Sequence, residues 1–347
     1  MLCSILPAAV LVCAGLLLGG VAGADVALDA MAVEDVYGFD DTPRAEPLDH
    51  PAWFKASFLD LDADLKAAVA AGKQGLMVYF GQPRCAYCHK LMTVNFGSPD
   101  IVEYTRKHFD VVAIDVWGID EVTDIGGERL TERALAEHEQ TNFTPAILFY
   151  DAAGKVALRL RGYYPPYQFR AALEYVADGH HQRESFRDYL ARGDNRMVFD
   201  EGDLNDESFF APPPYNLDRR YPSERPLAVF FEQGDCHGCD VLHGQSLREE
   251  AIRGQFADLD SVQLDLRSTT PVVTPAGKPM TARDWAAELG LFYAPSILFF
   301  DERGREVLRV DSVVGFYRLR HLMTYINSKA YRTASFQQWR QGRELLP

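Results

Sequence analysis

At 347 residues, the chain is longer than one hydrophobic core usually supports, so its length favours two domains. Its hydrophobic content of 47% and its charged content of 24% are typical of a globular protein and exclude a disordered or fibrous one. The formal net charge of −15 argues against a nucleic-acid partner, because binding phosphates requires a basic face and the sequence shows none.

The N-terminus has the pattern of an export signal over residues 1–24. An apolar stretch from Ile5 to Val21 precedes Ala22-Gly23-Ala24, which fits a cleavage site between small residues. We therefore expect a periplasmic protein that is not stably inserted in a membrane after the signal is removed. The first residues contain no Lys or Arg, and the apolar stretch is nearly long enough to span a bilayer, so an uncleaved membrane anchor is the alternative.

Removal of this signal also removes Cys3 and Cys13. The rest of the chain then holds two cysteine pairs, each with the spacing CxxC: Cys85 with Cys88, and Cys236 with Cys239. A secreted protein that needs disulfides only for stability places its cysteines far apart, because stabilisation grows with the length of the closed loop. Pairs this close in sequence indicate redox chemistry instead.

Residues 25–50 are strongly acidic and contain two prolines, which predicts an extended or loosely ordered lead-in. A first domain over residues 51–192 follows, with strands and helices in alternation and a hairpin near its end. The expected elements are a helix at 59–71, a strand at 76–80, a helix from Cys85 that ends before Phe96, a helix capped by Ser98-Pro99, a strand at 110–116, a helix at 130–140, strands at 146–150 and 156–161, and a helix at 165–177.

A second domain over residues 226–347 repeats the first with an offset of 150. The segment 122–127 aligns with 272–277, which predicts a small hairpin beside the active site of each domain. Between the domains, residues 193–225 are rich in Asp, Glu and Pro, so we expect a semi-rigid linker that holds the domains apart. Phe209 and Phe210 inside it either dock on a domain surface or form a loose apolar patch.

Each cysteine pair follows an apolar run and opens a predicted helix. The attacking species in disulfide exchange is a thiolate, and the free amides and positive dipole end of a helix N-terminus stabilise that charge. Cys85 and Cys236 are thus the predicted nucleophiles. Cys88 and Cys239, one turn further on, are the predicted resolving cysteines.

A proline precedes a second apolar run in each copy, in the pairs Thr144-Pro145 and Ala294-Pro295. If this proline is cis, it brings the backbone of the residue before it next to the sulfur atoms, as an edge for an extended substrate. Two further side chains are candidates for the substrate site. Tyr87 offers an apolar contact, and His237 either adds positive charge beside Cys236 or faces solvent.

This order of strand, CxxC and X-Pro strand resembles the thioredoxin superfamily. The first domain is similar to the exported thioredoxin-like proteins found with bacterial sulfur-oxidation genes (SoxW-type), through the segments 85–90, 112–118 and 162–166. The resemblance implies an α/β chain of two tandem thioredoxin-like domains, each a central mixed sheet flanked by helices, with a dithiol active site.

The sequence departs from the thioredoxin pattern at two positions in each copy. The tryptophan usual before the first cysteine is Arg84 or Asp235, and the buried acid six positions before that cysteine is Tyr79 or Phe230. Asp235 is expected to oppose the Cys236 thiolate, because it places a like charge beside it.

Two other chemistries use cysteines at this spacing. Cys85 to His89 also spells the attachment motif of c-type haem, and four cysteines in two pairs are able to form a zinc site. The second copy has Asp240 where the haem ligand would stand, and the pairs are too far apart for a usual structural zinc site. We therefore expect no cofactor and no metal.

The sequence thus predicts an exported thiol:disulfide oxidoreductase that acts on protein disulfides or on small thiol or persulfide compounds. An upstream membrane or periplasmic thiol donor would supply its electrons. The resemblance favours reduction, and oxidation or isomerisation remain open, as does a relay between the sites. In the alternative reading, only the first domain is catalytic and the second serves as a substrate-binding or docking module.

Overall fold

The computed structural model describes residues 36–193 and 204–344. The predicted export signal, the first part of the lead-in and residues 194–203 near the start of the predicted linker lie outside these ranges. All described residues belong to one compact unit, Asp35–Pro347. In this part of the chain, no helix is both long enough and apolar enough to cross a membrane.

A four-stranded mixed sheet forms the centre of the first domain, in the order β2-β1-β5-β6. Strand β1 runs parallel to β2 and antiparallel to β5, and β5 pairs with β6 in a hairpin. The strand bounds are β1 (Gly75–Gly81), β2 (Phe109–Asp115), β5 (Ala146–Asp151) and β6 (Val156–Arg161). Every residue of β1 is buried, because helices cover both faces of the sheet.

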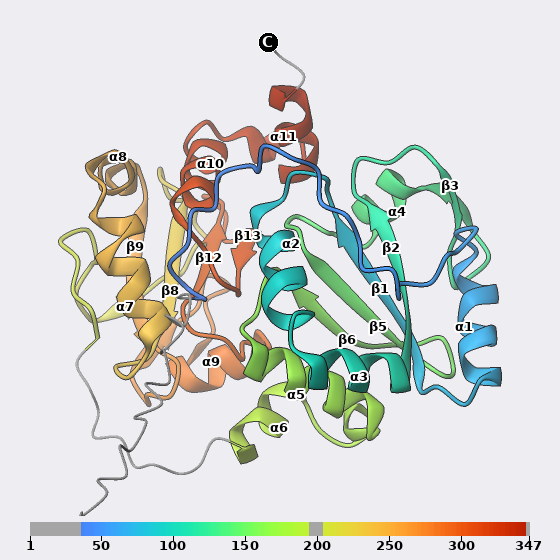
Figure 1. The fold of residues 1–347 in the computed structure, drawn as a ribbon. Coiled ribbons are helices and arrows are strands. Elements are labelled where there is room, and N and C mark those ends of the chain that lie inside the picture. Colours follow the sequence, from blue (N-terminus) through green and yellow to red (C-terminus); the bar gives the residue numbers. More distant parts are fainter. Residues whose placement is uncertain (1–35, 194–203, 345–347) are drawn as a thin grey trace, which may run out of the picture. The chain divides into compact units, whose positions relative to one another are not determined.

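The helices lie on both faces of this sheet (Figure 1). Helices α2, α3 and α5 pack on the face that carries Met77 and Tyr79, and α1 and α4 pack on the face that carries Leu76 and Val78. Their bounds are α1 (Leu61–Ala70), α2 (Ala86–Lys90), α3 (Pro99–His108), α4 (Glu132–His138), α5 (Pro166–Ala177) and α6 (Phe186–Gly193). One π-helical turn, Leu91–Asn95, extends α2 to just before Phe96, where the sequence predicts its end.

The second domain has the same sheet order, β13-β12-β8-β9, with the same strand directions. Its strands are β8 (Leu227–Glu232), β9 (Asp260–Asp265), β12 (Ser296–Phe300) and β13 (Glu306–Val310). Its helices are α7 (His237–Gly244), α8 (Glu250–Arg253), α9 (Ala282–Glu288), α10 (Phe316–Asn327) and α11 (Phe336–Glu344). The expected fold, two mixed sheets flanked by helices, is confirmed.

The offset of 150 predicted from the sequence also relates individual elements. The hairpin of β3 (Glu121–Thr123) and β4 (Arg129–Thr131) returns as β10 (Pro271–Val273) and β11 (Pro279–Thr281). A hairpin was expected here, but the helix expected over 130–140 is shorter. Leu130 and Thr131 belong to β4, and the Thr131 side chain caps α4 by accepting a hydrogen bond from the Ala134 amide.

The described part of the predicted linker is not a spacer. Residues 204–225 pack on the second domain, where the Phe209 ring stacks on Phe256 at 4.5 Å and the Phe210 ring meets Phe230 edge-on at 5.0 Å. Strand β7 (Tyr215–Asn216) also joins this segment to β10. The two phenylalanines therefore dock, because their rings complete the apolar core of the second domain.

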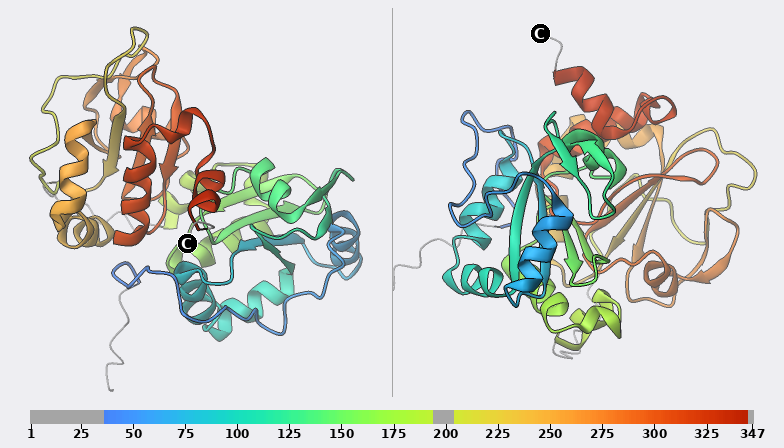
Figure 2. Two further views of the ribbon diagram at one scale, coloured as in Figure 1. Left: turned by 90° about the horizontal axis from the view of Figure 1, so that it is seen from above. Right: turned by 90° about the vertical axis from the view of Figure 1, so that its right-hand side faces the viewer.

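The expectation that the linker holds the domains apart is wrong. Tyr293 and Val313 of the second domain lie in the same buried cluster as Tyr163 and Tyr164 of the first. Phe143 of the first domain lies in turn in a core cluster of the second. Figure 2 shows the red C-terminal segment reaching the green first domain, where the Gln337 side chain donates a hydrogen bond to the Val116 carbonyl. Burial of apolar side chains from both domains explains this contact.

The described part of the lead-in, residues 36–50, is ordered and packed, contrary to the loose arrangement expected. In Figure 1 it is the blue segment, which starts beside the second domain, passes α10 and then runs along the first domain to α1. The Arg44 amide donates to the Arg84 carbonyl at 3.0 Å, and the Leu48 amide donates to the Pro83 carbonyl at 2.6 Å. Its apolar side chains pack against the core cluster of the first domain. The sequence does not predict this packing, because the segment is acidic and its few apolar residues show no helix or strand period.

Candidate active sites

Each cysteine pair stands at the start of a helix, as the sequence predicts. Cys85 is the N-cap of α2, and its sulfur accepts a hydrogen bond from the Cys88 amide at 2.9 Å. Cys236 is the N-cap of α7 and accepts from the Cys239 amide at 3.1 Å. Each pair forms a disulfide, Cys85–Cys88 and Cys236–Cys239. A thiolate at the first cysteine would receive the same amide bond and the positive end of the helix dipole.

The X-Pro residues lie immediately before β5 and β12, and both peptide bonds, Thr144–Pro145 and Ala294–Pro295, are cis. In the first site, the Cys85 sulfur lies 3.5 Å from the Thr144 carbonyl oxygen and accepts a hydrogen bond from the Thr144 hydroxyl at 3.3 Å. Ala294 has no hydroxyl to make the second contact. The first site therefore offers its nucleophile one more hydrogen-bond donor than the second.

The two sites differ in how far their sulfur atoms are covered. Cys85 is only 5% exposed and Cys88 is fully buried. Cys236 is partly exposed, whereas Cys239 is fully buried. In both sites the predicted nucleophile is thus the more accessible cysteine, and Cys236 is more exposed than Cys85.

Three parts of the chain meet over the first site. The Tyr87 hydroxyl donates to Asp41 of the lead-in at 2.7 Å and accepts from the Gly315 amide of the second domain, also at 2.7 Å. The guanidinium carbon of Arg318 lies 3.4 Å from the centre of the Tyr87 ring. Burial raises the pKa of Tyr87 well above its usual value. Tyr87 is thus buried beneath protein groups, and the substrate contact predicted for it stays a prediction.

The second site is bordered by the lead-in. The Tyr37 ring meets the exposed His237 edge-on, with ring centres 5.3 Å apart. A Cβ atom at Gly238 would lie 3.1 Å from the same ring and 3.3 Å from Pro295. Asp235 is exposed. The roles expected of His237 and Asp235 at Cys236 remain predictions.

A buried acid that the sequence analysis missed lies at the end of β8. Glu232 is fully buried and contacts Nε2 of His243 at 3.0 Å, while Nδ1 of that ring lies 3.2 Å from Glu207. Gln263 donates a further bond to Glu232 at 2.8 Å. Glu232 stands four positions before Cys236, whereas the thioredoxin pattern places its acid six positions before, so that pattern does not mark Glu232.

The carboxylates of Glu232 and Glu207 favour the protonated form of His243. Burial alone would lower the pKa of His243, but the hydrogen bonds and charges of Glu232 and Glu207 outweigh it and hold the pKa above its usual value. The first domain has Gly81 at the equivalent end of β1, next to the Tyr79 hydroxyl. At this position the described first domain therefore has no acid equivalent to Glu232.

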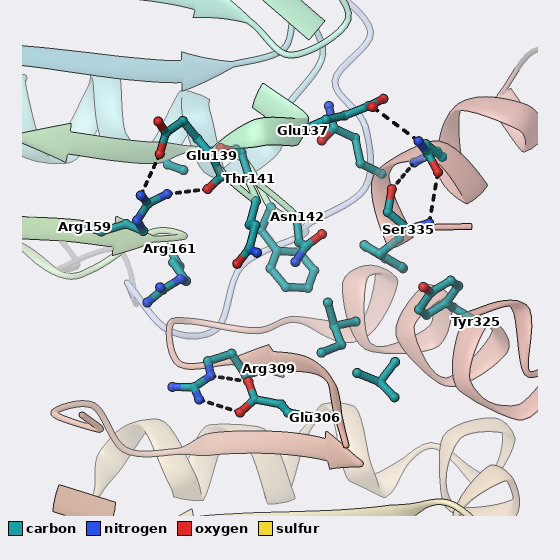
Figure 3. A pocket seen from close by; sticks show the side chains of 18 of the residues that line it. Glu137, Glu139, Thr141, Asn142, Arg159, Arg161, Glu306, Arg309, Tyr325 and Ser335 are labelled. Atoms are coloured by element: carbon teal, nitrogen blue, oxygen red, sulfur yellow. Dashed lines mark hydrogen bonds and ion pairs between the residues drawn. The ribbon is translucent and has the colours of Figure 1, made fainter. Parts of the chain in front are cut away.

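A polar pocket of about 830 Å³ lies between the two domains, away from the cysteines (Figure 3). Arg159 and Glu139 form an ion pair on one side, and Arg309 and Glu306 form another on the opposite side. Neither a cysteine nor an X-Pro residue lines it. No group of three or more His, Cys, Asp or Glu that could hold a metal ion occurs among residues 36–193 and 204–344.

Comparison with known families decides the classification of the chain. The family described as a thioredoxin-like domain matches residues 61–177 and again 219–327, together more than half of the chain. The chain belongs to the thioredoxin-like family. No curated protein matches its sequence. Two thioredoxin-like domains, each with a CxxC pair, make the arrangement of a thiol:disulfide oxidoreductase.

Several solved structures are similar to parts of this thioredoxin-like chain. A thioredoxin-fold protein from Helicobacter pylori is 24% identical, with a TM-score of 0.31, over 40% of this chain and 89% of its own. A disulphide isomerase from Xylella fastidiosa Temecula1 is 21% identical, with a TM-score of 0.23, over 41% of this chain and 96% of its own. The NTD_N/C domain of the alkylhydroperoxide reductase AhpF from Enterococcus faecalis is 14% identical, with a TM-score of 0.24, over 78% of this chain and 100% of its own.

The Thr144 hydroxyl should make Cys85 easier to deprotonate. Removing it in Thr144→Ala takes away one hydrogen bond to a charged sulfur, so the midpoint of the pH dependence of Cys85 alkylation should rise by about one pH unit. The matched variant Ala294→Thr adds a hydroxyl at the second site and should lower the Cys236 midpoint. Alkylation of the reduced protein at a series of pH values, followed by peptide mass spectrometry, measures both. Unchanged midpoints in both variants would contradict this role.

The Glu232–His243 pair should make the second domain less stable as pH rises. The stability from charged His243 is fully present below the pKa of an unfolded histidine, about 6.5, and is lost as pH rises through the higher folded-state pKa. The free energy of unfolding of the native protein should exceed that of Glu232→Gln by about 1–3 kcal/mol near pH 6. This difference should shrink by pH 8.

Denaturant unfolding of both proteins across this range measures the difference. Glu250→Gln, which changes an exposed acid on α8, is the control and should follow the native curve. An advantage of the native protein over Glu232→Gln that grows with pH would show that His243 does not carry the charge.

Proposed function

We propose that the protein is an exported thiol:disulfide oxidoreductase in which both CxxC pairs take part, and that it acts mainly as a reductase. The observation that carries the proposal is the repeated geometry of a helix-capping cysteine, a resolving cysteine one turn later and an X-Pro residue. That geometry recurs with a Cα–Cα distance of 5.1 Å in the first pair and 5.2 Å in the second.

Reduction of a substrate disulfide proceeds by two thiolate exchanges. The thiolate of Cys85 or Cys236 attacks one sulfur of the substrate, which forms a mixed disulfide and releases the other sulfur as a thiolate. The resolving cysteine, Cys88 or Cys239, loses its proton and attacks the first cysteine. This step closes the protein disulfide and releases the second substrate thiolate. Two electrons have then passed from the dithiol to the substrate.

The cycle requires a dithiol donor, because each turnover leaves the site oxidised. We propose a membrane or periplasmic thiol protein for this role, and protein disulfides or small thiol and persulfide compounds as substrates. The resemblance to exported SoxW-type proteins supports both the location and the direction. The partly exposed Cys236 supports the second site as the one that meets a protein partner, because such a partner needs access to the sulfur.

The alternative function, in which the second domain is a docking module, rests on the altered surroundings of Cys236. Asp235 places a like charge beside its thiolate, and Ala294 supplies no hydroxyl. The helix-capping position of Cys236 and its exposure favour the catalytic reading, since a docking module needs neither.

Three variants separate these functions: Cys85→Ser, Cys236→Ser and the two combined. With dithiothreitol as reductant and 2-hydroxyethyl disulfide as substrate, the combined variant should lose more than about 1,000-fold in kcat/KM, because both nucleophiles are gone. Each single variant should lose part of the activity. Full activity in Cys236→Ser would support the docking module, and full activity in the combined variant would end the redox proposal. Serine keeps nearly the volume of cysteine, so thermal unfolding should be unchanged.

A further inference from the structure

An arginine of the second domain lies in the active site of the first. Arg318 is in the first turn of α10 and is 9% exposed. Its guanidinium carbon lies 3.4 Å from the centre of the Tyr87 ring and 5.0 Å from that of Phe143. One of its nitrogens, Nη2, donates to the Thr144 carbonyl at 2.7 Å. A cation held against aromatic faces and shielded from water is attracted strongly by the rings.

The lead-in fixes this arginine in place. Asp41 accepts hydrogen bonds from the backbone amides of Tyr317 at 2.8 Å and Arg318 at 2.9 Å, at the positive end of α10. The same carboxylate accepts the Tyr87 hydroxyl. All three bonds involve a charged group, which makes them stronger than neutral ones. Arg318 is therefore a built part of the first site and not a side chain that happens to lie nearby.

The arginine occupies the edge on which a polypeptide substrate would lie. An extended chain binds beside another strand mainly through backbone hydrogen bonds. At the first site, the carbonyl next to the Cys85 sulfur belongs to Thr144, and it already accepts the bond from Arg318. Cys85 itself is 5% exposed. An extended polypeptide has neither the backbone partner nor the access that it needs there.

A small ligand meets a different surface. A pocket of about 40 Å³ opens beside Cys85, and its lining includes Arg84, Arg318 and Arg340. This volume holds about three water molecules, enough for a small charged group. Asp41 is the carboxylate in the lining, and both its oxygens are bonded to Tyr87 and the start of α10. The charge that the pocket presents to a ligand is thus positive.

One donor of Arg318 has no partner in the described part of the chain. Its Nη1 is buried and makes no hydrogen bond there, although buried donors are nearly always paired. A Cβ atom at Gly162, which does not line the pocket, would lie 3.7 Å from this nitrogen, so Nη1 does not face the pocket. The positive lining is the observation that points to an anion, because arginine forms paired bonds with carboxylates and similar anions.

We propose that Arg318 makes the Cys85 site specific for small disulfides and thiols that carry an anionic group, such as a carboxylate. The proposal rests on the proposed oxidoreductase function and names the substrate class of its first site. The arginine binds the anionic group beside the sulfur under attack, and the exchange itself follows the two thiolate steps described above. Arg318 is thus a specificity residue, and the more open Cys236 site is left for protein partners.

The test uses the full chain with Cys236→Ser and Cys239→Ser, so that only the first site reacts. Four disulfides are supplied with dithiothreitol as reductant: dithiodiglycolate, which is anionic, 2-hydroxyethyl disulfide, which is neutral, cystamine, which is cationic, and insulin. Each kcat/KM is divided by the rate of the uncatalysed reaction with dithiothreitol, which removes differences in leaving-group reactivity. The normalised kcat/KM of the anionic compound should exceed that of the cationic one by about tenfold or more. Insulin should have the lowest normalised kcat/KM.

In Arg318→Gln, the normalised kcat/KM of the anionic substrate divided by that of the cationic substrate should fall close to one, because the buried charge is gone. Arg320→Gln is the matched control. It removes the same charge from an exposed position on the same helix and outside the pocket lining, so the ratio should stay at the native value. Thermal unfolding checks that Arg318→Gln is folded, and if it is not, Arg318→Lys keeps the charge but loses the paired donors and should give an intermediate ratio.

Several results would overturn the specificity proposal. Equal normalised rates for the three small disulfides, or insulin as the best substrate, would contradict it while leaving the oxidoreductase function intact. An unchanged ratio in Arg318→Gln would show that another group selects the substrate. If the chain reduced none of the four disulfides, the proposed function of the first site would itself fail.

Discussion

The structure around the first active site depends on the carboxylate of Asp41. It accepts hydrogen bonds from the Tyr87 hydroxyl and from the two amides that begin α10, and so joins the lead-in, the first domain and the second domain at one point. Charge-assisted bonds of this kind are strong when they are shielded from water. The burial of Cys85 and the placement of Arg318 both follow from this junction.

The repeat explains why the two sites share their geometry, and the contacts between domains explain why they differ. The same sheet order and the same helix-capping cysteine occur in both copies. Only the first site receives a side chain from the other domain, among the contacts described, and only the second contains the buried Glu232–His243 pair. The duplicated fold thus supplies the chemistry, while residues far from the CxxC motifs set access and charge at each sulfur.

Local signals in the sequence predicted most of the fold. The apolar runs located the strands, the capping residues located α2 and α3, and the offset of 150 located the second domain. The roles of Asp41 and Arg318 were not predictable in this way, because their partners lie 46 and 174 positions away along the chain and no local pattern marks the pairing. The packing of the lead-in and of Phe209 was not predictable for a related reason. Acidic and proline-rich composition predicts a solvated segment, even where a few apolar side chains pack against a domain.

The rate of Cys85 alkylation in the reduced protein tests this account most directly. In Asp41→Ala the junction loses its charged acceptor, so iodoacetamide should modify Cys85 at least about tenfold faster than in the native protein, with Cys236 unchanged. Asp40→Ala, which alters the neighbouring exposed acid, should behave like the native protein. If Cys85 reacted equally fast in the native protein and in Asp41→Ala, the Asp41 junction would not be what covers the first site.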